Sequence, residues 1–232
     1  MIRRLRLTWP DRRPFAARGG RPIRFLAASD DPEPALDYEV NRTALGPLDG
    51  VIGCGDLEPH WLAFLADAFH APLVYVRGNH DRGLGWEEPR GRVPEPLGPG
   101  DTTRLAGIEV AGLEWPGVRR RGNARHDGLA WWHVLAVARR ALVSWLRGRG
   151  EPVLVISHAP PTGAGDVATD AYHLGFRAYR WLMGRLQPPL WLHGHTTTAS
   201  VTSLEAVVGP TTLVNVTGAV LVELVAPADG TG

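Results

Sequence analysis

Six side chains that can bind metal ions follow short apolar runs in this sequence. Each comes directly after a run rich in Val, Ile or Leu, or one to two residues later; they are Asp30, Asp56, Asn79, His158, His193 and His195. Carboxylates, an amide oxygen and imidazoles form a mixed oxygen and nitrogen set that suits divalent Mn, Fe, Ni or Zn. A carboxylate can also bridge two ions, as it does in two-metal hydrolases. These residues therefore predict a metal centre.

The apolar runs that precede these residues predict buried strands, because each is short and is bounded by turn residues. The runs are 23–28, 51–54, 73–77, 152–156 and 190–192. Amphipathic spacing predicts helices at 59–69, 129–147 and 176–186. Alternation of strand and helix indicates parallel pairing with right-handed crossovers, which places polar loop residues beyond the carboxyl ends of the strands.

The rest of the chain is expected to add peripheral elements. Residues 201–208, 212–216 and 219–225 are β-branched and look like antiparallel strands, 102–113 predicts a hairpin, and 86–100 predicts a loop rich in Pro and Gly. In the helix at 129–147, Trp132, Leu135, Leu142 and Trp145 have helical spacing. We expect residues 1–22 to form an N-terminal extension with one edge strand. Residues 23–226 then form a single domain, and 227–232 form a tail.

The ordered set Asp30, Gly55-Asp56, Gly78-Asn79-His80-Asp81, His158 and His193-Gly194-His195 resembles that of a calcineurin-like metallophosphoesterase. The resemblance covers residues 30–195, and the segment from Ser157 onward is similar to a little-characterised bacterial branch of that family. It implies an α/β fold: a four-layer αββα sandwich of two mixed β-sheets flanked by helices, with the metals at the sheet edge.

The resemblance also implies how the ligands divide between two divalent ions, with Mn preferred and Fe, Ni or Zn as alternatives. Asp56 would bridge both ions. One ion would be completed by Asn79, His158 and His193, and the other by Asp30 and His195. A hydroxide activated by the metals would attack the phosphorus of a phosphate ester, either a diester or a monoester.

Two further residues receive catalytic roles from the resemblance. His80 would be the general acid at the leaving-group oxygen, and Asp81 would orient its ring. Histidine suits this role because its pKa lies near neutral pH and a carboxylate can fix its tautomer. His173 is left open between a loop position near the site and a solvated one.

The first motif departs from the family pattern, which usually has Asp-x-His. Here Asp30 is followed by Asp31 and Pro32, and the side chain of proline cannot bind a metal. We therefore expect the site that contains Asp30 to bind its ion more weakly or to stay empty. This departure leaves a non-catalytic scaffold or binding module as one alternative function.

Composition narrows the class of partner. The formal net charge is +1, so no global field draws the chain to nucleic acid or to anionic membranes. All basic residues are arginine, and one cysteine excludes an internal disulfide. The sequence therefore predicts a cytoplasmic enzyme acting on a small-molecule phosphate ester, with no membrane partner and an open oligomeric state. A nuclease is the other alternative, although no basic groove is evident.

Overall fold

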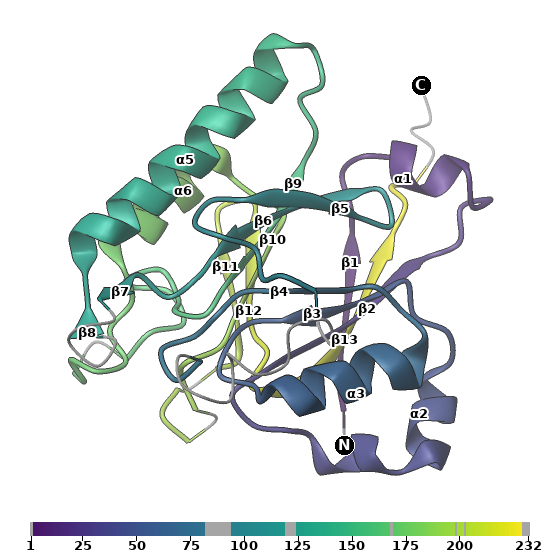
Figure 1. Ribbon diagram of the computed structural model, residues 1–232. Helices are drawn as coiled ribbons and strands as arrows, with labels where there is room; N and C mark the ends of the chain where they lie inside the picture. Colours follow the sequence, from purple (N-terminus) through teal and green to yellow (C-terminus); the bar gives the residue numbers. More distant parts are fainter. Residues whose placement is uncertain are drawn as a thin grey trace.

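Two mixed β-sheets lie face to face in this computed structural model (Figure 1), which describes residues 2–81, 94–118, 124–167, 169–197, 199–201 and 203–228. The order in the first sheet is β1 (Arg3–Thr8), β13 (Gly218–Val225), β2 (Ile23–Ser29), β3 (Gly50–Gly53) and β4 (Leu73–Tyr75). The order in the second is β11 (Glu205–Val208), β12 (Thr211–Asn215), β10 (Leu190–His193), β9 (Val153–Ser157), β6 (Ile108–Leu113) and β5 (Thr102–Leu105). A two-stranded ribbon, β7 (Gly117–Val118) with β8 (Ala124–Arg125), lies apart.

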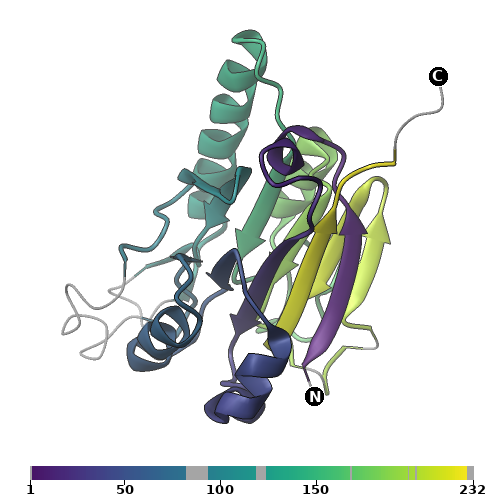
Figure 2. The same cartoon turned by 90° about the vertical axis from the view of Figure 1, so that its right-hand side faces the viewer.

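Helices cover the outer face of each sheet. The first sheet carries α2 (Glu39–Leu45) and α3 (Pro59–Phe69), and the second carries α5 (Asp127–Leu146) and α6 (Arg177–Leu186). Two short elements, α1 (Arg13–Ala16) and the 3-10 turn η1 (Pro34–Asp37), complete the described helices. One buried apolar cluster lies between the sheets, and two more lie between a sheet and its helices. These layers, of which Figure 2 gives a second view, confirm the predicted four-layer sandwich.

The parallel register brings four strand ends to one edge. In the first sheet β2 and β3 pair in parallel and end at Ser29 and Gly53. In the second, β9 and β10 pair in parallel and end at Ser157 and His193. Because the two sheets face each other, the residues that follow these strands converge from both. This convergence was expected from the polar residues after each apolar run.

The C-terminal strands differ from the expected antiparallel set. β11 and β12 are antiparallel, but β12 runs parallel to β10. β13 crosses to the other sheet, antiparallel to β2 and parallel to β1. A β-branched run shows that a strand forms but does not show its partner, because pairing depends on tertiary contacts. Of the predicted loop at 86–100, residues 94–100 form neither helix nor strand, and 86–93 lie outside the described residues.

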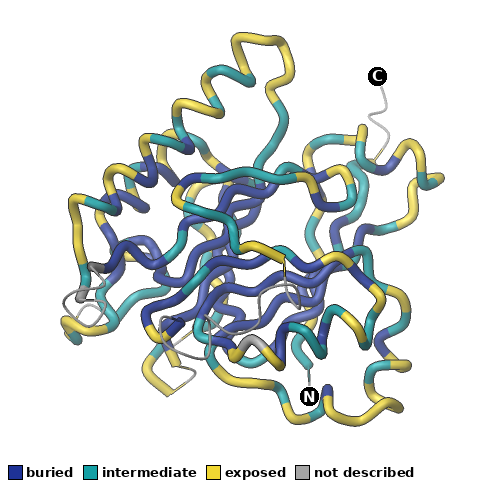
Figure 3. Tube along the Cα trace, viewed as in Figure 1, coloured by how far each residue is buried: buried dark blue, intermediate teal, exposed yellow. Residues whose placement is uncertain are grey.

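Helix α5 turns its large apolar side chains to solvent. Its buried face consists of Ala130, His133, Val134 and Val137. The four large residues whose spacing predicted the helix are all more than a third exposed; they are Trp132, Leu135, Leu142 and Trp145. Figure 3 shows the exposed residues along this helix. Helical periodicity therefore predicted the helix correctly but did not predict which of its faces packs against the sheet.

Candidate metal centre

Three of the predicted ligands meet where the strand ends converge. One carboxylate oxygen each of Asp30 and Asp56 and one ring nitrogen of His158 all lie within 4.8 Å of one another. Asp30 follows β2 and Asp56 follows β3 of the first sheet, whereas His158 follows β9 of the second. The centre is therefore built across the two sheets, which is why it depends on their packing.

The backbone is strained at these positions. Asp30 has φ 61°, Asp56 has φ 55° and His195 has φ 67°, all in the left-handed region that L-residues rarely adopt. Gly78 permits a close approach, because a Cβ there would stand 2.1 Å from Oδ1 of Asp56. Strain of this kind costs on the order of 1–3 kcal/mol per residue and tends to cluster at functional sites.

The surroundings of His158 fit a cation. Its Nδ1 atom lies 2.9 Å from the carbonyl oxygen of Cys54, which can only accept a hydrogen bond. Its Nε2 atom faces two more acceptors, Oδ1 of Asn79 at 2.8 Å and Oδ2 of Asp56 at 3.1 Å. With Nδ1 donating to Cys54, three lone pairs converge at Nε2 unless a proton or a metal ion lies between them. The donor set therefore fits a metal bound by Asp56, Asn79 and His158, with Asp30 close enough to join it.

The pKa values of this group reflect the same convergence. Burial alone would lower the pKa of His158, but the charge of Asp56 and the hydrogen bond to it raise this pKa to about 9. Burial would raise the pKa of Asp56, yet the charge of His158 and the hydrogen bonds from His158 and the His80 N–H lower it. Without a metal, a proton on His158 performs the cation's role.

Hydrogen bonds also fix the carboxylate of Asp30. The backbone N–H of His195 donates to its Oδ2 at 2.9 Å, and the hydroxyl of Thr217 donates to the same oxygen at 3.1 Å. Asp30 thus has two protein donors while keeping lone pairs for an ion. The neighbouring Asp31 is exposed and Pro32 offers no ligand atom, so the segment after Asp30 adds nothing observed to the cluster.

His193, the last residue of β10, and His195 lie outside the group of three. Nε2 of His195 is 2.9 Å from the carbonyl oxygen of Tyr172, and its ring centroid is 5.0 Å from that of His158. His193 has Nδ1 2.9 Å from the carbonyl oxygen of Gly194, and its Nε2 faces Gly165 closely enough that a Cβ there would stand 2.7 Å away. Burial lowers the pKa of His195 to about 3 and that of His193 to about 4, so both rings are neutral at neutral pH.

Tyr172 is a site residue that the sequence did not indicate. Its hydroxyl accepts a hydrogen bond from Nδ2 of Asn79 at 2.8 Å and lies 3.0 Å from Nε2 of His80. The centroid of its ring lies 4.9 Å from that of His173, and the His173 centroid lies 5.3 Å from that of His195. Nδ1 of His173 contacts the carboxylate of Asp170. The only available signal was the position beside His173, in a loop without periodicity.

Asp81 contacts backbone groups. Its Oδ2 accepts hydrogen bonds from the N–H of Asp56 at 2.6 Å and of Gly78 at 2.7 Å. Burial raises the pKa of Asp81 to about 6, in spite of these hydrogen bonds. Among the described residues, the polar group at the ring of His80 is the Tyr172 hydroxyl rather than Asp81. Asp81 instead fixes the loop from Gly78 to His80 against Asp56.

Comparison with known proteins places this geometry in a family. A sequence profile described as calcineurin-like phosphoesterase matches residues 46–198, more than half of the chain. No curated protein matches the sequence of this chain. The solved structure of TT1561 of Thermus thermophilus is similar at 18% identity, covering 85% of this chain and 90% of that one, with TM-score 0.54. GAP50, described as the anchor in the inner membrane complex of Plasmodium, is similar at 10% identity, covering 85% and 72%, with TM-score 0.51. At these identities the two solved structures show a shared fold. The sequence profile matches more than half of the chain, so the chain belongs to the calcineurin-like phosphoesterase family.

Proposed function

We propose that this protein hydrolyses phosphate esters of small soluble molecules and that the reaction depends on divalent metal, with Mn preferred. The observation that carries the proposal is the convergence of three ligand lone pairs on one point between Asp56, Asn79 and His158. Such a point is costly to maintain unless a cation occupies it. Family membership supports phosphate esters as the substrate class.

In this proposal each residue has a distinct task. Asp56, Asn79 and His158 hold one ion, and Asp30 and His195 contribute to a second, weaker position. When bound, the metals supply Lewis-acid stabilisation of charge on the phosphoryl oxygens and activate water. His193 is carried forward as a predicted ligand, although its observed contacts are with Gly194 and Gly165.

His80 is the proposed general acid. Its side chain is exposed at the site, its backbone N–H donates to Asp56, and its Nε2 lies next to the hydroxyl of Tyr172. These contacts hold the ring beside the metal cluster, with Nε2 within hydrogen-bonding distance of the Tyr172 hydroxyl. From this position a protonated Nε2 can transfer its proton to a leaving-group oxygen, which would otherwise depart as a poor alkoxide.

The experiment is hydrolysis of bis-p-nitrophenyl phosphate and p-nitrophenyl phosphate with added Mn, comparing wild type with His158→Gln. We expect turnover in the wild type that chelation removes, and loss of turnover in the variant. His60→Gln is the matched control, because His60 is an exposed residue of α3 that pairs with Glu58. Metal binding without turnover on either ester would favour the scaffold alternative, and turnover confined to nucleic acid would favour the nuclease.

A further inference from the structure

The exposed side of α5 carries an apolar stripe. Its members are spaced by three and four residues and so lie on one face; they are Trp132, Leu135, Leu142 and Leu146, with Arg139 between them. Trp132 is 69% exposed and Leu146 68% exposed, and Trp131 and Trp145 flank the stripe. An exposed apolar patch of this kind on a helix marks an interaction surface.

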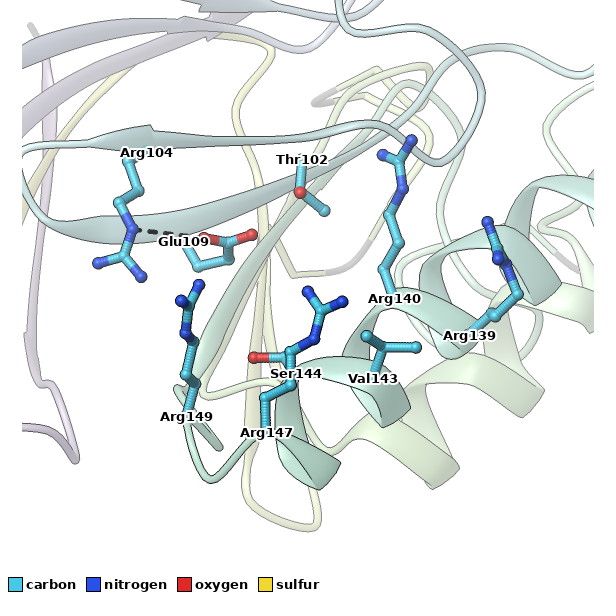
Figure 4. Close-up of a pocket in the computed structure, with 9 residues that line it drawn as sticks. All are labelled: Thr102, Arg104, Glu109, Arg139, Arg140, Val143, Ser144, Arg147 and Arg149. Atoms are coloured by element: carbon cyan, nitrogen blue, oxygen red, sulfur yellow. Dashed lines mark ion pairs between the residues drawn. The ribbon is translucent and has the colours of Figure 1, made fainter.

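The charged side chains beside the stripe are mostly arginines. Asp127, at the first position, is the only acidic residue of α5, and it pairs with Arg125. A cavity of about 310 Å³ opens between the second half of α5 and the β5–β6 hairpin (Figure 4). Five arginines line it against a single carboxylate, that of Glu109; they are Arg104, Arg139, Arg140, Arg147 and Arg149. The surface next to the apolar stripe therefore favours an anion.

Not all of these arginines are neutralised within the protein. Arg104 pairs with Glu151 and Glu109, and Arg140 pairs with Asp101. The guanidinium groups of Arg139 and Arg147 make no ion pair with any residue that the structure describes. Guanidinium groups match phosphate oxygens in geometry and charge, so these two are available to phosphate groups outside the protein.

We propose that α5 docks on an anionic membrane surface, with the apolar stripe inserted among the lipid chains and the arginines contacting lipid phosphates. Trp and Leu on one face with Arg beside them is the composition of helices that lie in the membrane interface. The C-terminal end of α5 projects beyond the sheets in both views, so a flat surface can reach it (Figures 1 and 2). No helix among the described residues is long and apolar enough to cross a bilayer.

A second copy of this chain fits the stripe less well. Arg139 lies midway between Trp132 and Leu146, so in a parallel two-fold pairing, or in an antiparallel one centred on the stripe, it would face Arg139 of the other copy. Like charges opposed in an apolar contact are unfavourable. The net charge of +1 predicted no membrane partner, but net charge sums over the whole chain, whereas this patch is local.

The test is flotation of the full chain with vesicles of phosphatidylcholine alone and of phosphatidylcholine mixed with phosphatidylglycerol. We expect binding to the mixed vesicles that falls as salt rises. Trp132→Ser combined with Leu142→Ser should lower the partition coefficient by at least about tenfold, and so should Arg139→Gln combined with Arg147→Gln. The matched control, Tyr38→Ser with Val207→Ser, changes two exposed apolar residues elsewhere and should bind as the wild type does.

Three results would overturn the proposal. One is failure to float with the mixed vesicles, and another is equal binding of the stripe variant and the wild type. The third is a doubled molar mass in solution that the stripe variant alone reduces to one chain, which would assign the surface to a second copy. Thermal unfolding of each variant, with an unchanged midpoint, shows that a loss of binding is not a loss of fold. None of these measurements uses metal or hydrolysis.

Discussion

The hydroxyl of Tyr172 lies 3.0 Å from Nε2 of His80, although the two residues are 92 positions apart in the chain. Nδ2 of Asn79 donates to the same hydroxyl, whose second lone pair can accept a hydrogen bond from a protonated Nε2 of His80. Tyr172 therefore joins the proposed general acid to a proposed metal ligand. A loop of the second half of the chain thus reaches the Gly78–Asp81 segment that follows β4.

We expect Tyr172→Phe to lower kcat by about tenfold with little change in KM, because one hydrogen bond that orients His80 is lost. The phenyl ring keeps the packing against His173 and His195, so the fold should be unaffected. Steady-state hydrolysis of bis-p-nitrophenyl phosphate measures both constants, and the exposed Tyr38→Phe serves as the control. An unchanged kcat would show that His80 is held by its backbone alone.

Metal affinity should depend on pH through His158. In the metal-free protein the pKa of His158 is raised to about 9, so at neutral pH the metal must displace a proton. Affinity should therefore rise by about tenfold per pH unit below this pKa and level off above it. Calorimetric titration with Mn in buffers of different ionisation enthalpy measures how many protons are released when the metal binds. We expect a release of about one proton near neutral pH. Zero release would mean that the ion binds without His158.

The predicted ligands should differ in their contributions. His158→Gln should weaken Mn binding by at least about a hundredfold, because its Nε2 lies at the point where the ligand atoms converge. His193→Gln should weaken binding less, since its two ring nitrogens face Gly194 and Gly165. Calorimetry on both variants, with His60→Gln as control, ranks them. A larger effect at His193 would place that residue among the direct ligands.

Sequence patterns were most informative where one local rule decides the outcome. The apolar runs before Asp30, Asp56 and His158 predicted strands, and parallel pairing then predicted that their carboxyl ends meet. Tyr172 escaped this reasoning because a loop residue without periodicity carries no local signal of its partners. Similarly, α5 was recognisable from its periodicity, but which face packs depends on the sheet it covers.

The pairing of the last strands also could not be predicted from local sequence patterns. The run at 219–225 was identifiable as a strand, yet its partners are β1 and β2 in the other sheet. Partner choice follows from where the chain lies after β12, which is a property of the whole fold. That Pro32 is not a metal ligand could be predicted from the sequence alone, since a side chain without a donor atom cannot bind a metal in any fold.

Two glycines provide a matched pair of stability tests. Gly78→Ala should destabilise the protein by about 1–3 kcal/mol and weaken Mn binding, because the added Cβ would stand 2.1 Å from Oδ1 of Asp56 and displace it. Gly184→Ala should instead stabilise it by about 0.5–1 kcal/mol. Gly184 lies in α6, where a Cβ meets nothing within 4 Å and alanine is the better helix former. Urea unfolding of both variants, followed by circular dichroism, measures the two free energies. A Gly78→Ala variant with the stability and the Mn affinity of the wild type would indicate that the Gly78 turn relaxes without moving Asp56, and the close approach would then not be what maintains the metal centre.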